Sequence, residues 1–202
     1  MEIRLSKLIG QGTVCRCFLH PDDQSLCVKI TDNICELRRM LDIDAAMPDL
    51  LRPWLVGHFG IVATDKGPGM LVELARDAEG TPARPLCEFP AGIGTTVAAS
   101  LDGFARAIIN NDLFFYDFNL KNFVVQDGER VRFVDLKGYH RNGYWGFLKL
   151  ENVFAPLARI IMYRRLRRMY AQIGLSFPFS PKIWRRPWTV KRFAIQHRLT
   201  YR

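Results

Sequence analysis

The chain of 202 residues is 49% hydrophobic and 24% charged, which is enough for one compact domain with a sizeable core. Five cysteines without Cys-x-x-Cys spacing argue against a zinc site and favour reduced thiols in a cytoplasmic protein. The N-terminus, Met1-Glu2-Ile3-Arg4, carries no hydrophobic block, and no apolar run is long enough to cross a bilayer, so we expect neither a signal peptide nor a membrane span.

Two glycines stand near the N-terminus, in the run Leu8-Ile9-Gly10-Gln11-Gly12-Thr13-Val14. Gly10 and Gly12 have no side chain to hold the backbone away from a nucleotide phosphate, so this run is a candidate phosphate-binding lid. The third glycine of such a loop is replaced by Cys15. A plain hairpin turn is therefore an equally good interpretation.

An apolar strand follows, Leu26-Cys27-Val28-Lys29-Ile30, and one cation interrupts it. A lysine in a buried strand needs a reason, and contact between Lys29 and nucleotide phosphates would supply one. The alternative is that Lys29 is an outward-facing residue of an alternating strand.

The next segment, 35–41, has helical spacing after a cap at Asp32 or Asn33. Glu36 in this helix is the candidate carboxylate that pairs with the strand lysine, or else a solvated acid that favours the helix N-terminal dipole. Residues 69–74 predict the last strand of a small sheet. Glu73 lies near its end, where a hinge between lobes would place an adenine beside the backbone.

Residues 92–110 carry apolar side chains at helical spacing, which predicts a long core helix. The run Asp117-Phe118-Asn119-Leu120-Lys121-Asn122 follows it. Asp117 is the candidate group that orients or deprotonates an acceptor hydroxyl, and Asn122 offers a hard oxygen ligand for Mg²⁺. Because Asp and Asn are also common in turns, each of these residues has a structural interpretation as well.

A hairpin connects this run to a second acid. The strand Phe123-Val124-Val125, a turn at 126–129 and a returning strand at 131–134 bring the chain to Asp135. The hairpin therefore carries Asn122 at one end and Asp135 at the other, where both oxygens could face one Mg²⁺ ion bound to nucleotide phosphates.

These motifs resemble the protein-kinase-like superfamily, in which a catalytic Asp and an Asn stand five residues apart and a metal-binding Asp opens an Asp-Phe-Gly motif. Lys29 in Cys27-Val28-Lys29-Ile30 matches the strand lysine of that superfamily. The His-Arg pair before Asp117 is missing, and Asp135-Leu136-Lys137 lacks the glycine of the second motif. Such departures are typical of small-molecule and lipopolysaccharide kinases.

The order and spacing of several short motifs also resemble the PhoP regulatory network protein YrbL family, over roughly residues 3–150. The motifs are Ile3-Arg4-Leu5-Ser6, 27–30, Glu36-Leu37-Arg38-Arg39 and Leu120-Lys121-Asn122. The resemblance implies an α+β, protein-kinase-like two-lobed fold, with a small N-terminal antiparallel sheet lobe at 1–74 and a reduced helical C-terminal lobe. In this scheme the catalytic loop lies in 75–151, and 152–202 is a basic helical extension.

The charge of this extension is distinctive, because 152–202 holds twelve Lys and Arg and no Asp or Glu. Residues 1–151 hold the other seventeen cations and all twenty acids. Residues 156–175 predict a helix that mixes apolar residues with arginines, and Trp184 and Trp188 follow among further arginines. The segment could bind an anionic membrane surface or lipopolysaccharide, form the solvated face of helices that pack inward, or bind nucleic acid. Nucleic acid is least favoured because no fold signature for it accompanies the charge.

We therefore predict ATP- and Mg²⁺-dependent transfer of a phosphoryl group to a hydroxyl of a sugar or lipopolysaccharide-type acceptor, in the cytoplasm and peripherally at the inner membrane. Lys29 would contact the phosphates, Glu36 would position Lys29, and Gly10 and Gly12 would cover the nucleotide. The rival interpretation is a non-catalytic, kinase-like regulatory or binding protein. The incomplete glycine loop and the missing His-Arg pair favour this rival.

Overall fold

The computed structural model describes residues 2–12, 14–89, 92–111, 113, 115, 118–136 and 155–180. The strands are β1 (Leu8–Gln11), β2 (Cys15–Leu19), β3 (Leu26–Thr31), β4 (His58–Thr64), β5 (Gly67–Glu73), β6 (Phe123–Gln126) and β7 (Arg130–Phe133). The helices are α1 (Ile34–Ala45), α2 (Thr95–Asn110) and α4 (Ala155–Gln172), with short 3-10 helices η1 (Asp49–Trp54), η2 (Leu86–Glu88) and η3 (Leu120–Asn122). The predicted α+β class is confirmed.

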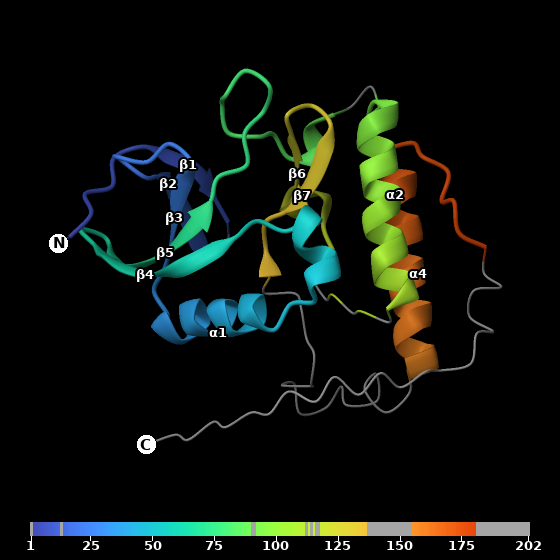
Figure 1. Cartoon of the computed structure of the whole chain (residues 1–202), viewed down its shortest axis with the longest axis horizontal. Coiled ribbons are helices and arrows are strands. Elements are labelled where there is room, and N and C mark those ends of the chain that lie inside the picture. The colour runs from blue at the N-terminus through green and yellow to red at the C-terminus, as the bar shows by residue number, and fades with distance from the viewer. Residues whose placement is uncertain are drawn as a thin grey trace.

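Five antiparallel strands in the order β1-β2-β3-β5-β4 form the N-terminal sheet, and α1 lies across one of its faces (Figure 1). Alternation along β3 assigns side chains to the two faces. Val28 and Ile30 pack with Leu5 and Phe18 on one face, whereas Cys27 belongs to the cluster that includes Leu37 and Met40 of α1. Lys29 shares the parity of Cys27 and therefore points to the α1 side of the sheet.

The helix α1 begins where the sequence predicts a cap. The side-chain Oδ1 of Asn33 accepts a hydrogen bond from the backbone N–H of Cys35 at 3.0 Å. This bond satisfies one of the N–H groups that the first turn of a helix leaves without a partner. Of the two candidates, Asp32 and Asn33, it is Asn33 that caps the helix.

The hairpin of β6 and β7 stands between the sheet and the two long helices (Figure 1). Its turn has φ of 54° at Asp127 and 70° at Gly128, and positive φ at both central residues is the requirement of the tight turn that suits twisted strands. The pairing Phe123↔Phe133 fixes the register. The hairpin predicted from the sequence is thus confirmed.

The helices α2 and α4 lie side by side and cover the largest apolar cluster (Figure 1). Phe104 of α2 contacts Phe115, Phe123 and Phe133, with ring centroids 5.5 to 6.2 Å apart. From α4, the cluster takes the buried side chains of Met162, Leu166, Met169 and Tyr170. The first part of the basic extension is therefore a structural member of the core.

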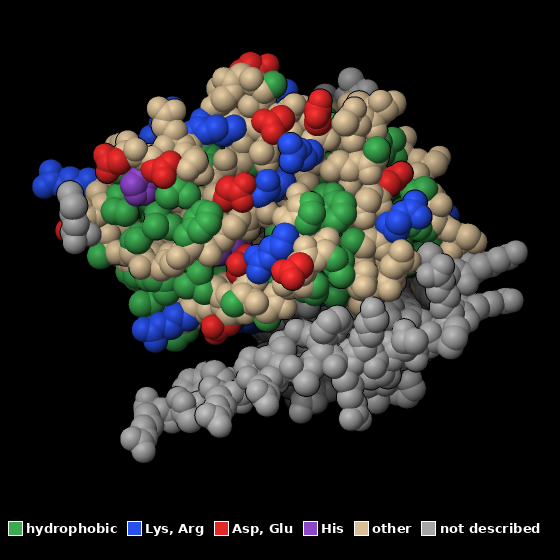
Figure 2. Space-filling view, viewed as in Figure 1, with side chains coloured by type: hydrophobic (Ala, Val, Ile, Leu, Met, Phe, Trp, Pro, Cys, Tyr) green, Lys and Arg blue, Asp and Glu red, His purple; other side chains and the backbone are tan. Residues whose placement is uncertain are grey.

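The exposed charged side chains of α4 are all basic. Arg164, Arg167 and Arg168 are exposed, whereas basic and acidic side chains are interspersed over the middle of the face seen in Figure 2. No helix within the described ranges has both the length and the apolar character that a bilayer crossing requires.

Candidate functional site

Lys29 is buried in the middle of the sheet, with 8% of its surface exposed. Its Nζ donates to Oδ1 of Asp135 at 3.4 Å. A buried ammonium group requires a counter-charge, because removal of a charge from water is costly. The alternative that Lys29 faces outward from the sheet is therefore wrong.

Asp135 reaches Lys29 from the end of the β6–β7 hairpin. Asn122 stands at the other end, and its backbone carbonyl accepts a hydrogen bond from the N–H of Val134 at 2.9 Å. The turn before β6 is fixed as well, because Oδ1 of Asn119 accepts from the N–H of Lys121 at 3.1 Å. The fold thus brings Lys29, Asp135 and the Asn122 backbone into one neighbourhood, and the metal-binding role of the Asn122 side chain stays a prediction.

Asp117, the candidate catalytic acid, lies outside the described residues, and so do Lys137 and Gly138. The catalytic role of Asp117 remains a prediction. Within the described ranges, no three His, Cys, Asp or Glu residues gather into a metal site. A Mg²⁺ ion between Asn122 and Asp135 would fit this sparse donor set, because Mg²⁺ usually keeps several waters and binds one or two protein carboxylates plus phosphate oxygens.

The glycines belong to the β1–β2 hairpin. Gly10 pairs with Cys17, and Cys17 pairs with Lys29 on its other side, so Gly10 and Lys29 lie two strand spacings apart, roughly 10 Å. The N–H of Gly12 donates to the carbonyl of Cys15 at 2.8 Å and closes the turn. The structure therefore contains the hairpin, and a covering role for it over phosphates remains a prediction.

The fold does not explain why these two positions are glycine. Neither Gly10 nor Gly12 is among the glycines of positive φ. A Cβ atom at Gly10 would lie 3.9 Å from the nearest atom, and one at Gly12 would lie 3.6 Å from the carbonyl of Cys15. Both are ordinary van der Waals distances, so the protein itself tolerates a side chain at either position.

Glu36 lies in the first turn of α1 and is half-buried. The ion pair that Lys29 makes is with Asp135, and no Lys29–Glu36 pair forms between these two described residues. Glu36 stands where an acid favours the positive end of the helix dipole. Its expected pairing with Lys29 is thus not formed in this structure.

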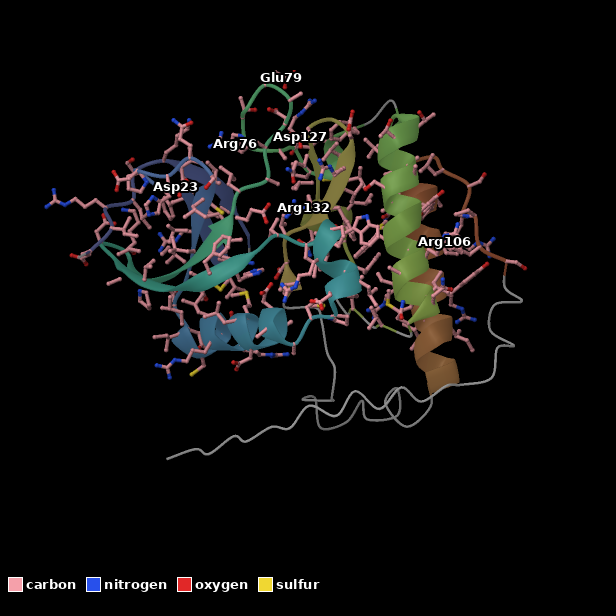
Figure 3. The ribbon with its side chains drawn as sticks, in the orientation of Figure 1. Asp23, Arg76, Glu79, Arg106, Asp127 and Arg132 are labelled. Atoms are coloured by element: carbon pink, nitrogen blue, oxygen red, sulfur yellow. The ribbon has the colours of Figure 1, made fainter. Side chains whose placement is uncertain are left out.

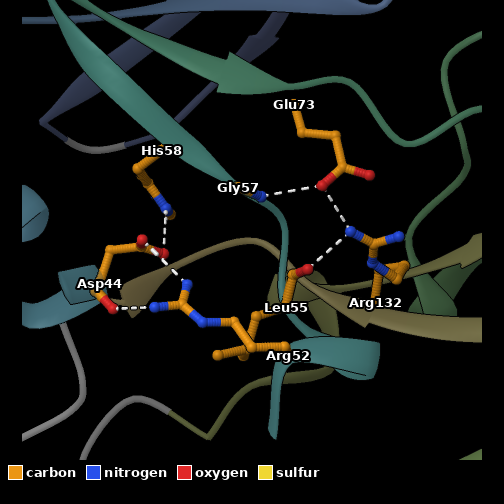
Figure 4. A network of polar contacts seen from close by, with 7 residues as sticks. All are labelled: Asp44, Arg52, Leu55, Gly57, His58, Glu73 and Arg132. Carbon is orange, nitrogen blue, oxygen red and sulfur yellow. Dashed lines mark hydrogen bonds and ion pairs between the residues drawn. The ribbon is translucent and has the colours of Figure 1, made fainter. Parts of the chain in front are cut away.

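Glu73 ends β5, and its side chain is part of a network that the sequence does not predict (Figure 4). Oε2 of Glu73 accepts from the N–H of Gly57 at 2.9 Å and from Arg132 at 2.6 Å. The Arg132 guanidinium also donates to the carbonyl of Leu55 at 2.6 Å. Arg132 is 8% exposed and lies in the middle of the molecule (Figure 3), so it joins the sheet to the hairpin.

The backbone at the expected hinge is already hydrogen-bonded. The N–H of Glu73 donates to the carbonyl of Gly57 at 2.8 Å, and the N–H of Leu74 donates to the carbonyl of Ser25 at 2.8 Å. Neither N–H can donate to an adenine in this arrangement. A base at this edge would have to use other backbone groups.

A second unpredicted network joins α1 to β4 (Figure 4). Oδ1 of Asp44 lies 3.2 Å from Nδ1 of His58, and Oδ2 of Asp44 accepts from Arg52 at 2.9 Å. Burial lowers the pKa of His58, although the Asp44 carboxylate opposes this effect. Nε2 of His58 is buried without a hydrogen-bond partner among the described residues. The imidazole is therefore neutral at pH 7, and the charges of both Lys29 and Asp135 act on its pKa.

Two thiols lie beside Lys29 on β2 and β3. Burial raises the pKa of Cys17, although the positive charge of Lys29 opposes this effect. Burial likewise raises the pKa of Cys27 to about 12. Because the thiolate is the reactive form, neither cysteine is suited to act as a nucleophile.

These features define an α+β protein in which a buried lysine of a five-stranded antiparallel sheet meets an aspartate at the end of a β-hairpin. The chain belongs to the PhoP regulatory network protein YrbL family, whose profile matches residues 1–174. It is also similar to the Uncharacterized protein YrbL of Escherichia coli (strain K12), with 33% identity over 96 residues. The match covers 43% of this chain and 46% of that protein, and the Shigella flexneri protein of the same name gives the same values. The chain thus matches about half the length of these curated relatives.

Proposed function

We propose that the protein is a kinase-like phosphotransferase with two lobes that moves a phosphoryl group from ATP to a hydroxyl in the presence of Mg²⁺. The contact between Nζ of Lys29 and Oδ1 of Asp135 carries this proposal. The two residues are 106 positions apart in the chain, and each matches a different motif of nucleotide phosphotransferases. Packing of the hairpin against the sheet places them 3.4 Å apart.

The roles follow from the chemistry of the side chains. The Lys29 ammonium would hold nucleotide phosphates, and Asp135 and Asn122 would hold Mg²⁺ through carboxylate and amide oxygens. The ion, when bound, neutralises charge on the phosphates. Asp117 would orient the acceptor hydroxyl and accept its proton.

Apolar residues from both sides meet next to this pair and would receive the base. Cys27 of β3, Val72 of β5 and Val124 of β6 belong to one buried cluster, with Leu74 and Val134 packed against it. Because the N–H groups of Glu73 and Leu74 are engaged, apolar contact would contribute most of the binding of an adenine here.

The acceptor that we propose is a sugar or lipopolysaccharide-type hydroxyl at the inner membrane. The exposed arginines of α4, Arg164, Arg167 and Arg168, support this choice. Each cation near an anionic surface contributes about 1 kcal/mol to binding. Their helix carries no acidic side chain that would offset them.

One alternative has support of its own, namely a non-catalytic kinase-like regulatory or binding protein. Lys29 pairs with Asp135 and not with Glu36, and the hinge N–H groups are bonded within the protein. Both observations support a protein with a kinase-like site that does not transfer phosphate.

A thermal-shift titration with ATP, with and without Mg²⁺, separates these possibilities. We expect stabilisation by ATP with Mg²⁺ in the wild type and its loss in Asp135→Asn and Lys29→Met. The matched control is Lys66→Met, because Lys66 and Asp65 form an exposed pair with the same 3.4 Å separation. No shift in the wild type at any metal concentration would refute the nucleotide site.

Transfer of labelled phosphate from ATP to membrane or lipopolysaccharide fractions then tests turnover. Binding of ATP without any transfer would favour the non-catalytic alternative.

A further inference from the structure

One ring nitrogen of His58, Nε2, is buried without a partner among the described residues. The other, Nδ1, lies 3.2 Å from Oδ1 of Asp44 (Figure 4), and Arg52 donates to the second oxygen of the same carboxylate at 2.9 Å. A carboxylate accepts hydrogen bonds, and the buried imidazole is neutral, so the hydrogen of the ring is on Nδ1. Nε2 therefore carries a lone pair, and a buried acceptor that meets no donor is costly.

His58 and Lys29 point to the same face of the sheet. His58 pairs with Val72 across β4 and β5, and Val72 pairs with Cys27 across β5 and β3. The side chains of paired residues share a face, and Lys29 lies two residues from Cys27 along β3, so it shares that face as well. Two strand spacings and two residues separate the Cα atoms of His58 and Lys29, roughly 12 Å. An extended lysine, an imidazole and one hydrogen bond between them span this separation.

Asp135 approaches His58 from the hairpin. The chain before β4 runs parallel to the chain that leaves β7, with a bridge between Leu55 and Phe133. The N–H of Val56 donates to the carbonyl of Phe133 at 3.3 Å. Asp135 and His58 follow this bridge closely in their two segments, so the end of the hairpin and the start of β4 lie side by side.

The electrostatics agree with this placement. Burial is the largest influence on the pKa of His58, followed by Asp44. The charges of Lys29, which lowers this pKa, and Asp135, which raises it, also act on the ring. Of these two groups only Lys29 has hydrogens to donate, and Asp135 is the acceptor that the described residues provide for its three donors. The donors of the ammonium and the lone pair of Nε2 are therefore complementary.

We propose that His58 is a positioning residue of the nucleotide site, whose Nε2 accepts a hydrogen bond from the Lys29 ammonium when Asp135 serves as a metal ligand. This inference rests on the proposed function. Asp44 holds the ring in the tautomer that leaves Nε2 able to accept. Because the imidazole is neutral, it holds Lys29 in place and leaves the whole positive charge for the phosphates. A carboxylate at this point, such as that of Glu36, would offset the charge.

The pairing can be measured without a nucleotide, because removal of the Asp135 carboxylate imitates its engagement by a metal. Long-range proton–nitrogen NMR at about pH 7.5, above the range in which histidine titrates, reports both ring nitrogens. The signals missing from His58→Gln are those of His58. In the wild type we expect the hydrogen on Nδ1. In Asp135→Leu, which nearly keeps the side-chain volume, the Nε2 resonance should move toward that of a hydrogen-bonded nitrogen.

The matched control is the double variant Asp135→Leu with Lys29→Met, which leaves neither charge of the pair. Its Nε2 resonance should return to the wild-type position. A hydrogen on Nε2 in the wild type would overturn the pairing, and this observation needs no variant. An unchanged Nε2 resonance in folded Asp135→Leu, or an equal displacement in the double variant, would overturn it as well.

Two substitutions of His58 separate positioning from packing. The amide of His58→Gln reaches the place of Nε2 and keeps an acceptor there, whereas the shorter amide of His58→Asn reaches the place of Nδ1 and keeps the donor to Asp44. Titration calorimetry with ATP and Mg²⁺ should give a Kd within about threefold of the wild type for His58→Gln and about tenfold higher for His58→Asn, because a charged group loses one hydrogen bond. Equal values, or the reverse order expected from a purely structural role through Asp44, would overturn the positioning role.

The two measurements distinguish this inference from the proposed function. If the wild type does not bind ATP but the Nε2 resonance responds to Asp135→Leu through Lys29, the nucleotide site fails and the pairing of His58 with Lys29 stands. If ATP binds and neither measurement responds, the positioning role fails and the nucleotide site stands.

Discussion

Two acid–base pairs connect the N-terminal sheet to the β6–β7 hairpin, and they are built differently. Arg132 meets Glu73 at 2.6 Å and also donates to Leu55 and Gln126, at 2.6 and 2.7 Å. Lys29 meets Asp135 in a single contact of 3.4 Å. The first pair is embedded in a network of short hydrogen bonds, whereas the contact that joins Lys29 to Asp135 is long.

The difference indicates which pair is structural and which is available for chemistry. The planar guanidinium of Arg132 donates to three acceptors, on Glu73, Leu55 and Gln126. Its Nε is buried without a hydrogen-bond partner among the described residues. A change in these hydrogen bonds would leave further buried polar groups without partners, which is costly. The Lys29 ammonium has three rotatable donors on a flexible stem, and Asp135 is its described acceptor. An incoming phosphate could therefore bind Lys29 with little rearrangement of the fold.

The largest expected effect follows from the loss of the structural pair between Arg132 and Glu73. Arg132→Met should lower the free energy of unfolding by about 2–4 kcal/mol, because Glu73 and the Leu55 carbonyl lose a charged partner at a partly buried site. Urea denaturation measures it. Arg130→Met is the matched control, since Arg130 lies exposed on the same strand. An equal loss in both variants would contradict the structural role.

The next effect is a pH dependence near the functional pair. Burial holds the pKa of His58 below 6.5 in the folded protein, so the unfolded chain takes up a proton first as the pH falls. This contribution to stability is complete above pH 6.5 and is lost below it, at up to about 1.4 kcal/mol per pH unit. His58→Gln should flatten this slope in urea titrations between pH 7 and 5, roughly the range in which histidine titrates. An unchanged slope would show that other groups cause it.

A smaller effect on stability is expected when the functional pair is broken. Lys29→Met should lower the free energy of unfolding by about 1–2 kcal/mol, because methionine fills similar space but the Asp135 carboxylate, whose side chain is 21% exposed, loses a long ion pair. Nucleotide-dependent stabilisation should nevertheless disappear. If Lys29→Met instead destabilised the protein as much as Arg132→Met, both pairs would be structural and the proposed distinction would fail.

The smallest stability effect concerns the glycine hairpin. Gly12→Ala should alter the free energy of unfolding by no more than about 0.5 kcal/mol, since the added Cβ makes an ordinary contact. Its nucleotide affinity, measured by titration calorimetry, should fall if backbone approaches the phosphates here. Gly69→Ala gives the contrast, because its Cβ would lie 2.5 Å from Cγ1 of Val28, and overpacking of this kind costs about 1–3 kcal/mol.

Local patterns in the sequence predict most of the elements around the site. The cap at Asn33, the strand with Lys29 and the Asp127-Gly128 hairpin all depend on neighbours in the chain, and each is confirmed. Glu36 shows the limit of this reasoning, because its partner is decided by how α1 packs on the sheet. The Arg132–Glu73 pair spans 59 residues, so no local pattern reveals it. The one available signal was a cation between Val131 and Phe133 in an apolar strand.

The packing of α4 determines where the basic C-terminal segment can be cut. Met162, Leu166 and Tyr170 are almost fully buried against α2 and the hairpin, and Tyr170 donates to Asp102 at 2.7 Å. Deletion of 152–202 would therefore remove part of the hydrophobic interior together with the positive charge, and loss of binding in such a shortened chain would report unfolding. A stop after residue 180 keeps all of these buried side chains. It still removes seven of the twelve cations of the segment, which makes it the cleaner way to ask what those charges attract.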